Sequence, residues 1–300
     1  MALTLAEAEK LSNDVLLQGV IETIIKDKPL LEMLPFIPIT GNGLTYNQEN
    51  AAATAGFFAV GGTWTENTPT FTQLTAKLVI CGGDADVDNF LARTRGNVQD
   101  LEAAVIQLKA KAVADKLEDT LVNGDTVTDA NSFDGLDKLI GSGAQLVSMG
   151  TNGATLSLAK LDDLIDTVLG EKPGILMMSK RSRRTLNSLF RASGSGVLPI
   201  ERTEWGSFIE LYNGIPIVTS DYISDAKTVG TSTDCSTIYA VVMGEGAFSG
   251  LSSVGAPSIV EVERIGSLET KDATRTRVKA YVSCALFNSK KAARLIGVRP

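Results

Sequence analysis

The chain has 300 residues, of which 44% are hydrophobic and 21% charged, with a formal net charge of −7. This composition predicts a globular protein with a sizeable core, and no apolar run approaches the 18 residues that suggest a membrane span. The sequence contains no histidine, which excludes Ser-His-Asp and Cys-His catalysis and imidazole metal ligation. The acidic balance argues against a dedicated nucleic-acid-binding module.

Three widely spaced cysteines form no CxxC pair, so the sequence predicts buried free thiols rather than a disulfide scaffold or a thiolate metal site. They are Cys81, Cys235 and Cys284. Free thiols fit synthesis in a reducing cytoplasm. The first ten residues, MALTLAEAEK, lack the basic run and apolar core of a signal peptide.

Residues 1–40 are expected to form an N-terminal arm. A helical pattern extends to Lys28-Pro29, and a short apolar piece then ends at Pro35. An arm of this size has too little mass for its own core, so it must lie on the rest of the chain or on a neighbouring subunit. The apolar positions of the helical pattern are Leu5, Ala8, Leu11, Val15, Leu16, Leu17, Val20 and Ile24.

Residues 41–76 are rich in Thr, Ala and Gly and poor in charge. Alternation from Thr68 to Ile80 and the Gly61-Gly62 step predict two strands joined by a flexible middle. An isolated two-stranded ribbon is marginally stable, so its aromatic residues need a surface. The segment is either an internal hairpin of a sandwich or a projecting arm that docks on another subunit. Its aromatic residues are Phe57, Phe58, Trp64 and Phe71.

The next segment, residues 77–91, reads as strand, turn and strand. Asp84, Asp86 and Asp88 alternate and therefore share one strand face. The pattern DxDxDN resembles the start of a calcium loop, but Asn89 stands where the loop needs Gly and Arg95 where it needs Glu. We expect a solvated face, or carboxylates that pair with arginines across a subunit interface, rather than a metal site.

The longest helical signal covers residues 97–123. Apolar residues recur in steps of three and four, Asn97 can cap the start, and Asn123-Gly124 ends the run. At about 1.5 Å per residue the helix spans roughly 40 Å and needs a partner along its length. The predicted apolar stripe comprises Val98, Leu101, Val105, Leu108, Ala112, Val113, Leu117 and Leu121.

Residues 123–153 read as a crossover rich in Gly, Asp and Ser, which leads to an α/β-like region from about residue 155 to residue 250, with helices expected after Ser157 and Ser179. The second of these is basic, with Arg181, Arg183, Arg184 and Arg191, and is either a solvated face or a phosphate contact. No phosphate-binding loop or nucleophile elbow occurs.

Residues 251–300 return to strands. Arg275, Arg277 and Lys279 alternate with smaller residues along a long half-exposed strand.

This order resembles the major capsid protein of tailed bacteriophages, over essentially the whole chain. The local sequences that carry the resemblance are PLLEMLPF, LTYNQEN, GGTWTENTPTFTQ, GGDADVDNF, NGIPIV, GEGAFSGL and TRTRVKAYVSCALFNSKKAARLIGV. No single one of them is diagnostic.

The resemblance implies an α+β capsid fold with five parts. These are an N-terminal arm (1–40), an extended β-hairpin loop (41–76), a peripheral domain with a spine helix at 97–123 (77–125 and 251–300), and an axial domain (126–250). The charged side of the spine helix is then expected to face the shell interior or neighbouring subunits, through Lys109, Lys111, Asp115, Lys116, Glu118 and Asp119.

The function implied is structural, without catalytic residues, cofactor or metal. Copies would form pentamers and hexamers that tile an icosahedral shell around phage double-stranded DNA, in virions assembled in the host cytoplasm. The expected partners are further copies of the chain, a separate scaffolding protein and a portal. The expected interface residues are Phe57, Phe58, Trp64, Phe71, Asp84, Asp86, Asp88, Arg275 and Arg277.

Two departures from some family members matter. No lysine lies between Lys28 and Lys77, so an isopeptide crosslink from the extended loop is not expected. Only about 40 residues precede the loop, so we expect a separate scaffolding protein or earlier removal of a scaffold segment. Two alternatives stay open: an encapsulin, which is a cellular shell around a cargo enzyme, and a carboxylate-based hydrolase that uses Asp84, Asp86 and Asp88.

Overall fold

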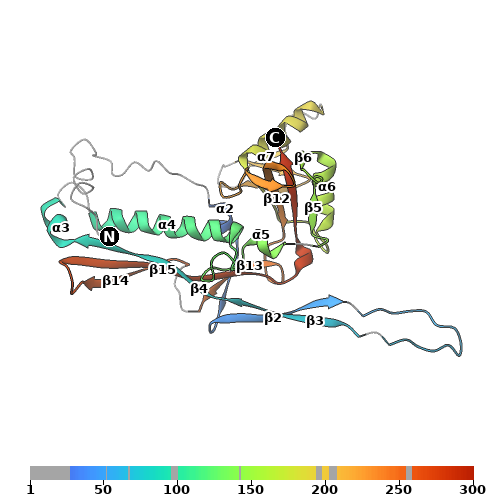
Figure 1. Cartoon of the computed structure of the whole chain (residues 1–300), viewed down its shortest axis with the longest axis horizontal. Coiled ribbons are helices and arrows are strands. Elements are labelled where there is room, and N and C mark those ends of the chain that lie inside the picture. Colours follow the sequence, from blue (N-terminus) through green and yellow to red (C-terminus); the bar gives the residue numbers. More distant parts are fainter. Residues whose placement is uncertain are drawn as a thin grey trace.

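The computed structural model describes residues 28–51, 53–66, 68–95, 101–141, 143–193, 198–202, 208–254 and 259–300. The helix expected within residues 1–28 and the cap expected at Asn97 lie outside these ranges. The fold is α+β, as predicted, and the described strands form three sheets. Figure 1 shows an elongated subunit in which one long helix runs beside a sheet and a ribbon extends beyond a second sheet.

The five-stranded sheet has the order β1-β13-β15-β14, and β4 pairs with β15 along the other side of that strand. Strand β15 is the centre of this sheet because it pairs with three neighbours, β4, β13 and β14, all antiparallel. The strands are β1 (Phe36–Ile39), β4 (Val79–Asp88), β13 (Phe248–Ser253), β14 (Glu261–Ser267) and β15 (Ala273–Leu286).

The nine-stranded sheet has the order β5-β16-β12-β7-β10-β9-β8, with β11 on β12 and β6 on β16. Its strands are β5 (Leu146–Ser148), β6 (Ala154–Thr155), β7 (Ile175–Met178), β8 (Ile200–Arg202), β9 (Phe208–Tyr212), β10 (Ile215–Thr219), β11 (Lys227–Val229), β12 (Ser232–Val241) and β16 (Ala292–Arg299). The described helices are α2 (Pro29–Met33), α3 (Asn89–Arg95), α4 (Leu101–Asn123), α5 (Leu136–Leu139), α6 (Leu158–Thr167), α7 (Lys180–Ala192) and the 3₁₀ turn η1 (Ser289–Lys291).

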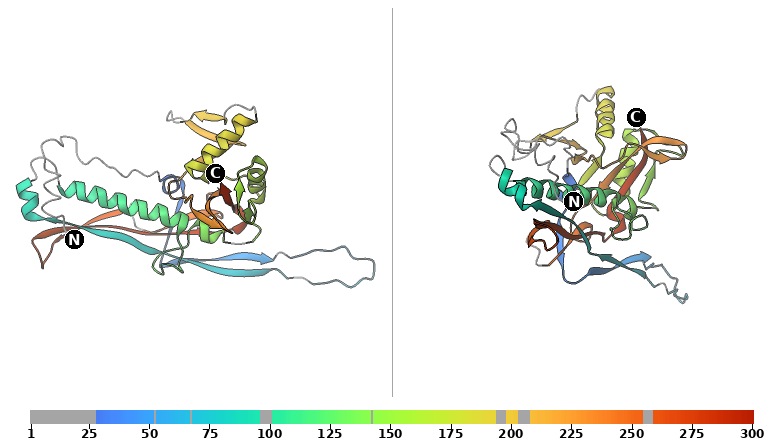
Figure 2. Two further views of the ribbon diagram at one scale, coloured as in Figure 1. Left: turned by 45° about the horizontal axis from the view of Figure 1, so that its top comes forward. Right: turned by 60° about the vertical axis from the view of Figure 1, so that its left-hand side comes forward.

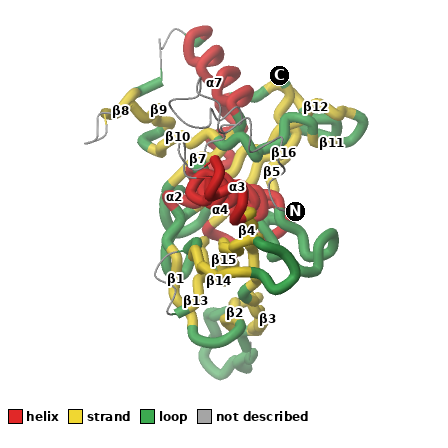
Figure 3. Tube along the Cα trace, turned by 90° about the vertical axis from the view of Figure 1, so that its left-hand side faces the viewer, coloured by secondary structure: helices red, strands yellow, loops and turns green. Residues whose placement is uncertain are grey.

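Two hydrophobic cores lie on opposite faces of the nine-stranded sheet. Along β7, Leu176 and Met178 join one core with α6 and α7, while Ile175 and Met177 join the other. This alternation follows from the two-residue period of a strand that is buried on both faces. The second core also takes in the inward residues of β15 and one side of α4. Figure 3 shows α4 between the two sheets.

Helix α4 covers β4 and β15, as a long spine helix should. Leu117 and Leu121 are only 2% exposed, and Val113 is also buried. The end of the Lys109 side chain lies over Gly83 of β4, where a Cβ would overlap its Cε. The helix ends at Asn123, where the sequence predicted its end.

The predicted apolar stripe of α4 is wrong at Leu108 and Ala112. Leu108 is 40% exposed and Ala112 is also exposed, whereas Ile106 and Ala110 pack on the core. A stripe drawn in steps of three and four drifts around a helix of 3.6 residues per turn. The drift carries Leu108 away from the sheet that Val113 and Leu117 face.

The expected grouping of the strands needs two corrections. β16 was expected with the other C-terminal strands, but it pairs with β12 and β5 in the nine-stranded sheet. β1, from the expected N-terminal arm, pairs in parallel with β13 in the five-stranded sheet. Both pairings join segments far apart in the sequence, and strand periodicity alone does not identify such partners.

Candidate assembly surfaces

The ribbon consists of β2 (Gly43–Ala51) and β3 (Thr70–Lys77), which pair only with each other among the described strands. The structure therefore rules out an internal hairpin of a sandwich. The foot of the ribbon rests on the end of β15. Gln48 Nε2 donates hydrogen bonds to the carbonyls of Leu286 (2.8 Å) and Phe287 (2.9 Å), and the Tyr46 ring meets the Phe287 ring edge-on at 5.0 Å.

The tip of the ribbon, described for residues 53–66 and 68–69, extends away from the body in both views of Figure 2. Phe57 is fully exposed and Trp64 is 78% exposed. The ring of Phe58 stacks on that of Trp64 at 4.5 Å, and Phe71 is exposed on β3. Such a concentration of exposed aromatic side chains marks a contact surface. The sequence predicted these four residues as interface residues, and their contact with a second subunit stays a prediction.

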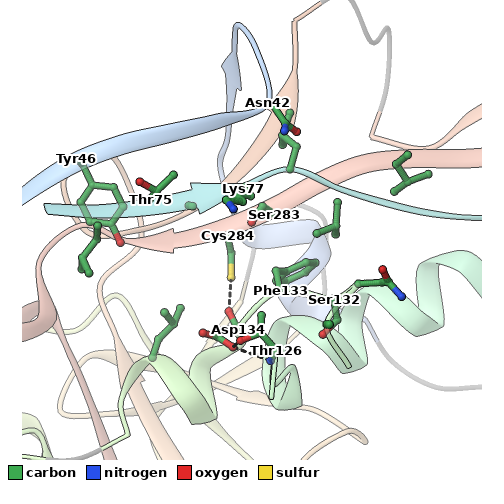
Figure 4. A pocket seen from close by; sticks show the side chains of 18 residues that line it. Asn42, Tyr46, Thr75, Lys77, Thr126, Ser132, Phe133, Asp134, Ser283 and Cys284 are labelled. Carbon is green, nitrogen blue, oxygen red and sulfur yellow. Dashed lines mark hydrogen bonds between the residues drawn. The ribbon is translucent and has the colours of Figure 1, made fainter. Parts of the chain in front are cut away.

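A groove of about 800 Å³ lies beside the foot of the ribbon. Figure 4 shows its lining: β3 and the start of β4 on one side and the loop before α5 on the other. Asp134 orders this loop, because its Oδ1 accepts hydrogen bonds from Thr126 N and Oγ1, both at 2.8 Å. Cys284 Sγ donates to the Asp134 carbonyl at 3.2 Å. The groove mixes hydroxyl, amide and apolar groups and is open to solvent.

The aspartates of β4 pair with cations of the same chain. Arg277 binds Asp84 through two nitrogens at 2.6 and 3.0 Å, and Arg275 binds Asp86 in the same way at 2.6 and 2.8 Å. Lys271 also reaches Asp86 at 2.6 Å. The antiparallel register of β4 and β15 places each pair directly opposite. The arginine partners of Asp84 and Asp86 in this subunit therefore lie on β15 of the same chain. Contact of these residues with a second subunit stays a prediction.

These pairs shift the acidity of the carboxyl groups. The hydrogen bond from Arg277 lowers the pKa of Asp84, and the hydrogen bond from Arg275, aided by Lys271, lowers the pKa of Asp86 far below its usual range. Asp88 has a different role: its Oδ1 accepts hydrogen bonds from the backbone N–H groups of Phe90 and Leu91 at the start of α3. Carboxylates held in this way are not available as a general base or as metal ligands.

The ladder of charges continues onto β14. Lys279 binds Glu263 at 2.6 Å and approaches Glu261 at 3.8 Å. Acidic residues of β4 and β14 thus flank the basic residues of β15 across three strands. The outer face of this sheet balances its own charges, which indicates a solvated face rather than a nucleic-acid surface. No group of three or more His, Cys, Asp or Glu in the described residues is arranged to hold a metal ion.

The basic helix α7 is partly engaged within the subunit. Arg181 donates to the carbonyl of Asp234 at 2.7 Å, and Arg183 approaches Glu210 at 4.0 Å. On the side of α7 that faces the sheet, Leu186 packs into the core. Arg184 and Arg191 lie on the exposed side. A solvated helix face explains the pattern.

Sequence reasoning missed the role of Glu118. This residue was expected on the outward charged side of α4, yet it is fully buried. Its carboxylate accepts hydrogen bonds from the backbone N–H groups of Leu30 (3.1 Å) and Leu31 (2.8 Å) in α2. One turn earlier, Asp115 binds Lys28 at 3.0 Å. The i, i+3 spacing of two acids on α4 was visible in the sequence, but its partner was not.

Comparison with known families decides the identity of the fold. The phage capsid family matches residues 11–295. The chain belongs to the phage capsid family. It is therefore a capsid-type shell protein with a structural role. No curated protein sequence matches the chain significantly.

Solved structures agree with this family assignment. The chain is similar to the capsid protein of cyanophage A-1(L), with a TM-score of 0.73 and 11% identity over 97% of this chain and 99% of the other. It is also similar to the capsid protein of Myoviridae phage XM1, with a TM-score of 0.67 and 13% identity over 93% and 95% of the two chains.

The family fold is shared with an encapsulin. The holo-SrpI encapsulin complex from Synechococcus elongatus PCC 7942 matches with a TM-score of 0.72 and 19% identity, over 100% of this chain and 97% of the other. Identities this low show the fold alone. The predicted resemblance to the tailed-phage capsid fold, shared with encapsulins, is confirmed. Among the described residues, no helix is long and apolar enough to cross a membrane.

Proposed function

We propose that this capsid protein assembles as pentamers and hexamers into an icosahedral shell that encloses phage double-stranded DNA. The observation that carries the proposal is the ribbon, which exposes Phe57 and Trp64 at its tip and Phe71 on β3 to solvent in the single subunit. Burial of apolar surface is the main favourable term in association. A tip that lies over a neighbouring subunit would remove these side chains from water.

The proposed organisation of the subunit follows the family fold. Residues 41–76 form the extended loop, residues 77–125 with β13, β14 and β15 form the peripheral domain, and residues 126–247 form the axial domain. We assign β16 to the axial domain because it pairs with β12 and β5 there. We also propose a separate scaffolding protein, a portal and assembly in the host cytoplasm. DNA would be enclosed without sequence-specific contact, in keeping with the net charge of −7.

A second candidate is an encapsulin-type shell that encloses a cargo enzyme. It is favoured by the 0.72 TM-score and 19% identity to the encapsulin from Synechococcus elongatus. Electron microscopy of particles purified from the native source distinguishes the two. A particle with a portal at one vertex and DNA inside supports the phage shell. A closed particle with protein cargo and no portal supports the encapsulin.

Deletion of residues 50–66 tests the role of the ribbon. We expect the shortened chain to fold, because the ribbon foot keeps its contacts with Leu286 and Phe287 through Tyr46 and Gln48. We expect no shells, as judged by size-exclusion chromatography and electron microscopy. A shortened chain that still forms complete shells, or one that loses the circular dichroism of the parent, would contradict this role.

A further inference from the structure

The groove beside the foot of the ribbon is bordered by a strand edge that has no partner. Residues 74–80, from the end of β3 into β4, all line it. Successive side chains of a strand point to opposite faces, so a lining of consecutive residues means that the strand's edge borders the groove. Among the described strands β3 pairs only with β2. Its other edge therefore offers unpaired backbone groups.

The register of the ribbon identifies these backbone groups. Leu78 N donates to the Asn42 carbonyl at 3.0 Å, one step before Gly43 meets Lys77 in the ladder. Residues of an antiparallel strand alternate between those that bond to the partner strand and those that do not. The backbone N–H and C=O groups of Thr75 and Lys77 thus point away from β2. These donors and acceptors are open to an extended chain.

The groove also holds apolar surface and a positive charge. Ile80 is 75% exposed and Leu74 is 38% exposed, while Phe133 lines the opposite wall. Lys77 is exposed and forms no ion pair with any described residue. A matching occupant is therefore extended, carries apolar side chains and has an acidic residue near them.

The tip of the ribbon has all three properties. Its backbone at residues 53–59 and 62–66 belongs to no helix and to no ladder among the described strands. The stacked rings of Phe58 and Trp64 supply apolar surface. Glu66 is exposed, two residues after Trp64, and has no cationic partner in the part of the chain that the structure describes.

The tip cannot reach the groove of its own chain. Figure 1 shows the tip beyond the ends of β2 and β3, whereas the groove lies beside the opposite end of the ribbon, as the close view in Figure 4 shows. The occupant must then come from a second copy. A contact between two different surfaces of identical chains is head-to-tail, and it generates rings when the rotation closes.

We propose that the ribbon tip of a second copy occupies this groove. An extended stretch of the tip lies along the open edge of β3, the stacked aromatic pair packs against Leu74 and Ile80, and Glu66 lies beside Lys77. Strand addition supplies backbone hydrogen bonds, and the side chains supply selectivity. This inference rests on the proposed shell function and names the surface that receives the tip.

A charge swap in the full-length protein tests the contact. Lys77→Glu and Glu66→Lys, each alone, should raise the protein concentration needed for shell formation by about tenfold, because like charges then meet in the groove. The double variant restores opposite charges and should assemble within about twofold of the parent. Light scattering and electron microscopy measure assembly, and circular dichroism checks that each variant folds.

The matched control is Lys290→Glu, which reverses an exposed cation of η1 outside the groove. Combined with Glu66→Lys, it should not restore assembly. A Lys77→Glu, Glu66→Lys double variant that assembles no better than its single variants would overturn the proposal, and so would equal rescue by Lys290→Glu.

The charge swap and the deletion of residues 50–66 separate this contact from the general role of the ribbon. If the deletion abolishes shells but the swap restores nothing, the tip has another acceptor and the groove is not its site. If the deletion leaves shells intact, the proposed role of the ribbon fails as well.

Disulfide trapping in assembled shells gives a second measurement. Thr65→Cys stands beside Trp64 at the tip, and Asn131→Cys stands on the loop side of the groove. Interchain bonds should form with a yield about tenfold above that of Thr65→Cys with Ser188→Cys, an exposed position on α7. Single-cysteine variants measure the background from Cys81, the half-buried native thiol. Intrachain bonds, or equal yields from the two pairs, would overturn the proposal.

Discussion

Single residues tie the N-terminal part of the described chain to the spine helix. Glu118 is buried and both of its oxygens accept backbone N–H groups, from Leu30 and Leu31. Burial raises the pKa of the Glu118 carboxyl, and the two hydrogen bonds oppose that rise. The neighbouring charges are Lys28, Glu32 and Asp115, with Tyr222 on Asp115. The residue joins α2 to α4 at the centre of the subunit.

Replacing Glu118 tests this role. Glu118→Ala should lower the free energy of unfolding by about 2–3 kcal/mol, because two buried N–H groups lose their acceptors. Chemical denaturation of the dissociated protein measures the change. The matched variant Asp115→Ala removes an acid from the same helix that is 26% exposed, so its effect should be smaller. Equal effects of the two substitutions would contradict the special role of Glu118.

The carboxylates of β4 predict a dependence of stability on pH. Arg277 and Arg275 lower the pKa values of Asp84 and Asp86 in the folded chain. The unfolded chain therefore binds more protons in acid, so the free energy of unfolding should fall as the pH drops below about 4. The stabilisation is present above that pH. Denaturant titrations at several pH values measure the slope.

Two variants isolate the contribution of this pair. Asp86→Asn removes the titrating group, and Arg275→Gln removes the partner that lowers its pKa. Both should flatten the fall in stability between about pH 4 and pH 2, because the proton uptake that distinguishes the two states is reduced. An unchanged slope in both variants would show that other carboxylates control the acid transition.

At the scale of elements, the ribbon separates folding from assembly. Phe57→Ala should leave the stability of the subunit within about 0.5 kcal/mol of the parent, since its side chain is fully exposed. It should raise the protein concentration needed for shell formation by roughly tenfold or more, because aromatic anchors dominate interface energies. Light scattering follows assembly. The control Leu169→Ala removes an exposed apolar side chain just after α6 and should leave assembly unchanged.

Sequence patterns predicted several of these elements but not how they pack. Alternation together with the Gly61-Gly62 step predicted the pair of strands β2 and β3, and a helical period predicted α4 through Asn123. Each of these patterns reports local geometry. The placement of β4 and β15 decides which side of α4 is buried near Leu108. The predicted stripe drifts around the helix and therefore does not identify the buried side. Tyr46 and Gln48 alternate along β2, yet only the end of β15 explains their role.

At the scale of the whole molecule, the two sheets share a core. Met177 and Tyr239 of the nine-stranded sheet pack in one cluster with Val278 and Val282 of the five-stranded sheet, together with Leu117 of α4. If one sheet unfolded, the apolar side chains of the other sheet that pack in this cluster would be exposed to water. The peripheral and axial parts should therefore unfold as one cooperative unit, although each has its own hydrogen-bonded sheet.

Hydrogen exchange under increasing denaturant measures this cooperativity. Amides of β15 and β12 should exchange with the same free energy of opening, equal to that of global unfolding. Amides of the ribbon strands β2 and β3 should open at lower free energy, because only the foot of the ribbon packs on the body, against a small apolar cluster around Ile39 and Leu251. Distinct opening energies for β15 and β12 would show that the sheets unfold independently.

The sequence by itself determined the local elements, the absence of histidine chemistry and the family resemblance, because these depend on neighbouring residues and on composition. Tertiary structure alone decided that β16 joins the nine-stranded sheet, that Arg275 and Arg277 pair with Asp86 and Asp84 of their own chain, and that Glu118 is buried beneath α2. The contacts of Glu118, Arg275 and Arg277 join residues between 87 and 193 positions apart in the sequence. The pairing of β16 with β12 joins strands that are closer in the sequence, from Val241 with Ala292 to Ser236 with Val298. Their formation depends on packing across the whole chain rather than on any local period.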